Sequence, residues 1–73
     1  MQIAITDQTL AVLVHELGEE CRHVVDLIAQ LQLATLSVEQ KSDVLAELMT
    51  ATIHLHSHCD QDFQDAIAQE LEQ

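Results

Sequence analysis

The spacing of hydrophobic residues in the C-terminal half of the chain predicts one long helix. After Ser37, apolar and small neutral side chains fall on one side of a helix at about 100° per residue, and their phase is unchanged across residues 57–60. Ser37 and Gln40 have the spacing of a capping box, which marks a helix start. We therefore predict a continuous helix over residues 38–71. The alternative is a break near residues 58–60, with Asp60 capping a third helix.

A second helix is predicted in the N-terminal half, where apolar residues are spaced alternately four and three apart. They are Leu10, Val14, Leu17, Cys21, Val24, Ile28 and Leu31. This heptad pattern is typical of coiled coils and helix bundles. Thr6 is a candidate N-cap, so this helix is expected over about residues 7–32. A connection at residues 33–37 is short enough to make the two helices antiparallel neighbours.

Further hydrophobic residues flank both stripes, and one neighbouring helix cannot cover them all. Burying a Leu or Ile side chain contributes roughly 1.5–3 kcal/mol relative to leaving it in water. We therefore predict that the hairpin pairs with a second copy into a four-helix bundle. The predicted core and dimer interface comprise Leu10, Leu13, Val14, Leu17, Cys21, Val24, Val25, Ile28, Leu45, Leu48, Thr52, Leu55, His56, Cys59 and Phe63.

Composition supports an all-α fold with a single helical domain over residues 1–73. The chain has one Gly and no Pro, so it has few residues suited to the tight turns of a β-sheet protein. The alternative architecture is a three-helix bundle, which follows from the break near residues 58–60.

The charge of the chain restricts its partners. Thirteen acidic residues against two basic ones give a formal net charge of −11, which excludes direct binding to nucleic acid phosphates or to an anionic membrane surface. A basic protein is the partner that such a surface favours. The chain has no apolar run of about 18 residues and no signal-peptide pattern at its start. We expect a cytoplasmic protein, with Cys21 and Cys59 as reduced thiols.

Histidines supply the candidate metal ligands. His54 and His58 lie one helical turn apart, and Asp62 continues the same line. Such a group can hold Zn²⁺ or Ni²⁺ weakly, whereas the alternative is a solvated helix face with incidental histidines. His56 and Cys59 lie within the apolar stripe, where they form either a polar layer inside the bundle or a thiolate–imidazole pair. No other cofactor is expected.

Two acidic segments suggest an enzyme as a further alternative. Glu16 and Glu19 in the first helix, followed after the turn by Asp43, resemble the acidic motifs of the all-α MazG-type nucleotide pyrophosphohydrolases, although Gln40 replaces an acidic residue of the second motif. The resemblance implies Mg²⁺ held between two bundle helices. The function we predict is instead a small acidic helical interaction or regulatory module, acting as a homodimer without catalysis. Metal binding and nucleotide hydrolysis are the alternatives.

Overall fold

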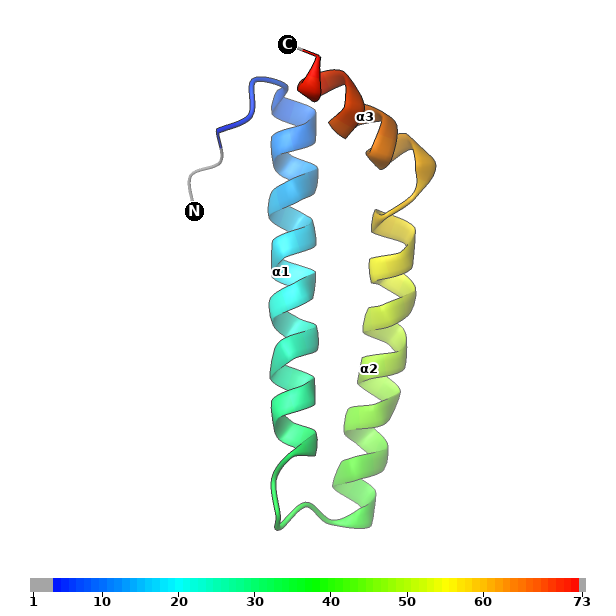
Figure 1. Ribbon diagram of the computed structural model, residues 1–73. Helices are drawn as coiled ribbons and strands as arrows, with labels where there is room; N and C mark the ends of the chain where they lie inside the picture. Colours follow the sequence, from blue (N-terminus) through cyan, green and yellow to red (C-terminus); the bar gives the residue numbers. More distant parts are fainter. Residues whose placement is uncertain (1–3, 73) are drawn as a thin grey trace.

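The computed structural model describes residues 4–72, and every regular element within that range is a helix. Helix α1 spans Gln8–Leu31, α2 spans Val38–His58, and α3 spans Gln61–Leu71. The first two helices lie side by side in opposite directions, and α3 turns back over their open end toward the start of α1 (Figure 1). The prediction of an all-α fold is confirmed. Residues 1–3 and 73 of the predicted domain lie outside the described residues.

Side-chain caps fix where the first two helices begin. Ser37 and Gln40 form the predicted capping box: the Gln40 backbone N–H donates to the Ser37 hydroxyl at 3.1 Å, and the Ser37 N–H donates to the Gln40 side chain at 2.9 Å. The cap predicted at Thr6 is wrong. Asp7 caps α1 instead, because its carboxylate accepts the Leu10 backbone N–H at 3.0 Å, and a carboxylate also suits the positive end of the helix dipole.

The prediction of one helix over residues 38–71 is wrong, and the break lies where the alternative placed it. Asp60 leaves the helical conformation, and its carboxylate accepts the Phe63 backbone N–H at 2.9 Å as the N-cap of α3. The Gln64 side chain also donates to the Cys59 carbonyl at 3.1 Å. An Asp side chain that bonds the local backbone competes with helix continuation. The phase of the hydrophobic stripe along the sequence gives no information about this competition.

The residues that line the seam between α1 and α2 differ from the predicted ones. Helix α2 is rotated about its axis relative to the prediction. In α1, every second contact position is occupied by the residue one place earlier in the sequence than predicted. Leu27, Val44 and Ala51 form the central buried cluster, against which Val24, Leu31 and Leu48 pack. Leu10 and Phe63 of the predicted core are buried, and Leu13, Val14, Leu17, Val24, Leu48 and Leu55 are half-buried. The other predicted core residues are exposed in the single chain: Cys21, Val25, Ile28, Leu45, Thr52, His56 and Cys59.

The molecule is only one helix thick. Its principal extents are 50 × 24 × 14 Å, and a single helix with its side chains has a diameter of about 10–12 Å. Domains normally bury their hydrophobic faces between two layers of helices or sheets. Here the two broad faces of the α1–α2 pair both lack a covering layer within the described chain. The short α3 covers only the open end.

A hydrogen-bonded contact ties the end of α3 to the start of α1. Glu70 accepts hydrogen bonds from the Thr6 hydroxyl at 2.7 Å, the Thr6 N–H at 3.3 Å and the Asp7 N–H at 3.2 Å. The hydroxyl bond, followed by the Asp7 backbone bond, lowers the pKa of the Glu70 carboxyl below its ordinary value.

None of the helices over residues 4–72 combines the length and apolar character that a membrane crossing requires.

Candidate functional site

One broad face of the α1–α2 pair carries a continuous set of apolar side chains. Successive residues are rotated by about 100° around a helix axis. When this rotation is applied to both antiparallel helices, the side chains that flank the seam on this side of α1 and of α2 lie on one common face of the pair. We call this the aliphatic face, and we define it by Val14, Cys21, Val25 and Ile28 of α1 with Leu45, Met49 and Thr52 of α2. Val25 and Met49 are 64% and 63% exposed. The face therefore presents large hydrophobic side chains to solvent.

The aliphatic face is also free of carboxylates. The same rotation places all acidic residues of α1 and α2 in the seam, on the opposite broad face or at the outer edges of the pair. They are Glu16, Glu19, Glu20, Asp26, Glu39, Asp43 and Glu47. Lys41, one of the two basic residues of the chain, lies on the aliphatic side at the start of α2. The strong negative charge of the molecule is thus absent from this one face of the two long helices.

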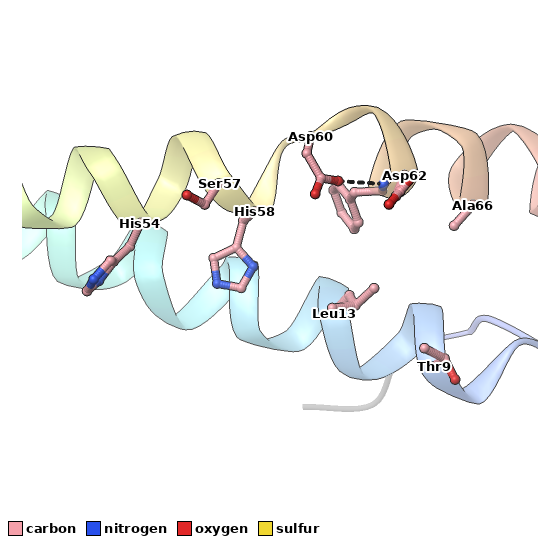
Figure 2. A pocket seen from close by; sticks show the side chains of 9 residues that line it. Thr9, Leu13, His54, Ser57, His58, Asp60, Asp62 and Ala66 are labelled. Carbon is pink, nitrogen blue, oxygen red and sulfur yellow. Dashed lines mark hydrogen bonds between the residues drawn. The ribbon is translucent and has the colours of Figure 1, made fainter.

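The opposite broad face, which we call the polar face, is hollowed where α2 passes into α3. A groove of about 530 Å³ is lined by the apolar side chains of Leu13, Phe63 and Ala66, and Figure 2 shows Leu13 of α1 and Ala66 of α3 on opposite sides of it. Its other lining residues are polar: Thr9, His54, Ser57, His58, Asp60 and Asp62. The groove residues come from all three helices and none belongs to the aliphatic face, so the two faces differ in both shape and chemistry.

The predicted metal ligands line this groove without forming a closed ligand set. His54 and His58 project from α2 toward α1, and Asp62 lies beyond the break at the start of α3 (Figure 2). Among the side chains at positions 4–72, no group of three or more His, Cys, Asp and Glu residues is arranged to hold a metal ion. The helix break removes the single line of ligands on which the prediction rested. His56 and Cys59 do not enter the α1–α2 seam, and both are exposed.

The acidic residues that resemble a pyrophosphohydrolase motif do not converge. Asp43 lies beside Gln30 in a groove near the turn, and Gln30 is about 21 Å along α1 from Glu16 at 1.5 Å per residue. Glu19 instead contacts the His15 imidazole, at 2.6 Å. Gln40, where that motif calls for an acidic residue, is part of the capping box. A metal bridging α1 and α2 is therefore not supported by these residues.

Glu20 is a groove-lining residue that the sequence prediction missed. It occupies a seam position between Leu17 and Val24, and its Oε1 is buried with no hydrogen-bond partner among the described residues. The His54 Nδ1 is 3.6 Å from that oxygen, and the two residues share a groove of about 430 Å³ with His23, Glu47, Thr50 and Ala51. The small Ala51, 2% exposed, leaves room for the carboxylate. A heptad pattern drawn through Leu17, Glu20 and Val24, with steps of three and four residues, would have predicted that Glu20 lies in the seam.

Comparisons of the chain with protein-family models, with curated proteins and with solved structures gave no match, so its function has to be argued from the two faces themselves.

Proposed function

We propose that this protein is a small, non-catalytic interaction module that binds another protein through its aliphatic face. The observation that carries the proposal is the exposure of large hydrophobic side chains on that face, in a molecule one helix thick. Contiguous exposed apolar patches on a small protein mark interaction surfaces, whereas isolated exposed hydrophobic residues are ordinary. Val25, Ile28, Leu45 and Met49 come from two adjacent helices on one side, so they form a contiguous patch.

The charge distribution gives the module a second role in binding. With the aliphatic face covered, the carboxylates of α1 and α2 other than Glu20 remain in solvent on the polar face and the outer edges. A surface of this sign attracts a basic protein and speeds its association at low ionic strength. We therefore propose a module that assembles through the aliphatic face and presents acidic helices to a basic protein. Regulation of that protein by occupying its basic surface fits this arrangement.

Site-specific photo-crosslinking tests the proposal without assuming the identity of the partner. A photoreactive amino acid replaces Val25 on the aliphatic face, and Val12 serves as the matched control. Both are valines of α1, and they are 64% and 55% exposed, but Val12 lies away from the aliphatic face. In cells expressing the protein, we expect defined adducts from position 25 that position 12 does not give. Adducts specific to position 12 report instead on a basic protein bound to the acidic side. The same adducts at both positions, or none at position 25, contradict the proposal.

A further inference from the structure

We infer that the partner on the aliphatic face is a second copy of this chain, packed face to face so that the two helix pairs form a four-helix bundle; this inference rests on the proposed function of that face. Three properties of the described chain point to a copy of itself. They are where the carboxylates lie, how thin the molecule is, and how large the face is.

The carboxylates determine which surfaces of two copies can approach. Each chain carries a formal net charge of −11, so contact through most surfaces brings acidic side chains together, and like-charge contact across an interface costs several kcal/mol. The aliphatic face of α1 and α2 carries none of these carboxylates. Two copies therefore meet with the least repulsion through this face, while the remaining surface keeps the dimer soluble.

The dimensions of the face suit a stable interface between identical partners. Helix α1 has 24 residues and is therefore about 36 Å long at 1.5 Å per residue. With a molecular width of 24 Å, the broad side of the α1–α2 pair offers at most about 860 Å² to a partner, and stable interfaces bury about 800 Å² on each side. Stacking one 14 Å layer on another also supplies the second helical layer that the single chain lacks. A twofold arrangement uses the same patch on both copies, so each aliphatic face covers the other.

The mass of the 73-residue chain in solution tests this inference. We expect sedimentation equilibrium at micromolar concentration to give twice the chain mass of 8.1 kDa. Val25→Glu and Met49→Glu each place an uncompensated carboxylate in the apolar interface, which disfavours burial; we expect each to raise the dimer Kd at least about 100-fold, a loss of roughly 2.8 kcal/mol at 1.4 kcal/mol per tenfold change. Val12→Glu, outside the face, leaves the dimer intact. Circular dichroism checks that each variant remains helical.

Salt provides an independent readout. Because both copies are acidic, raising the ionic strength screens their repulsion, and the dimer Kd is expected to fall. A monomeric wild type, equal effects of the Val12 and Val25 variants, or a dimer weakened by salt would each overturn the inference. A monomer that still crosslinks to another protein through position 25 refutes the second copy and leaves the proposed function standing. A monomer without such crosslinks refutes both.

Discussion

Replacing Glu20 with Leu is expected to stabilise the folded protein. Glu20 occupies a seam position whose neighbours along α1 are Leu17 and Val24, and its buried Oε1 has no hydrogen-bond donor among the described residues. His54 does not compensate, because its Nδ1 is 3.6 Å away and its side chain is 64% exposed. Partly exposed ion pairs contribute about 0–1 kcal/mol. One oxygen of the carboxylate is therefore buried in the seam without a hydrogen bond, while the side chain as a whole is 20% exposed.

The size of the gain follows from the terms that change. An unsatisfied buried polar group costs about 1–3 kcal/mol, and the loss of the His54 contact removes at most about 1 kcal/mol. A Leu side chain in place of Glu20 also adds apolar burial beside Ala51. We therefore expect the free energy of unfolding to rise by about 1–3 kcal/mol, which for a domain of this size raises Tm by about 4–8 °C per kcal/mol.

Urea denaturation followed by circular dichroism measures this change. Several protein concentrations are used, so that any contribution of association to stability is separated from that of the seam. Glu16→Leu is the matched control, because Glu16 is exposed on the same helix and is expected to change stability by less than about 0.5 kcal/mol. Glu20→Gln keeps a polar group in the seam and should show little of the gain. A Glu20→Leu protein no more stable than wild type refutes the reasoning.

Three other predictions concern the helix ends and the single glycine. Asp60→Ala removes the N-cap of α3 and is expected to cost about 0.5–2 kcal/mol and to speed amide exchange in α3, whereas Asp60→Asn, which retains a capping oxygen, preserves protection. Gly18→Ala is expected to stabilise α1 by about 0.5–1 kcal/mol in urea denaturation, because the added Cβ meets nothing closer than the Arg22 guanidinium at 3.8 Å; a loss of stability would contradict this. Because hydrogen bonds lower the folded-state pKa of Glu70, its contact with α1 stabilises the fold above the ordinary Glu pKa and is lost as pH falls through the lowered value. NMR titration should find the carboxyl pKa of Glu70 nearer its ordinary value in Thr6→Val, and an unchanged titration would contradict the assignment.

The helices themselves were predictable because local chemistry determines them. The capping box at Ser37 and Gln40 formed as predicted, and the first helix begins and ends within a residue of its predicted bounds. The break at Asp60 was visible only as an alternative. Hydrophobic phase favoured continuation, while a single carboxylate at the right position for an N-cap favoured interruption. Which of these prevails depends on where Phe63 is buried, and that burial arises from the tertiary fold.

The orientation of the helices about their own axes was harder to predict. The seam of α1 was predicted to pass through Val14, Cys21 and Ile28, because a stripe this wide can be centred on more than one line. The observed seam passes through Leu27 and Glu20, and a sequence argument avoids placing a carboxylate there. The groove on the polar face was likewise not predictable, because it depends on α3 bringing Phe63 and Asp62 back toward Leu13.

The contact between Glu70 and the Thr6–Asp7 segment brings sequence positions near the two chain ends together. Joining the two ends of this 73-residue chain by a flexible linker and opening it at Thr35, in the exposed connection between α1 and α2, would therefore give a circular permutant with the same helix arrangement. In that molecule α2 would precede α1, and their mutual packing would have to form across the new linker. Its folding rate, compared with that of the natural order, would report whether pairing of the long helices or closure by α3 comes first.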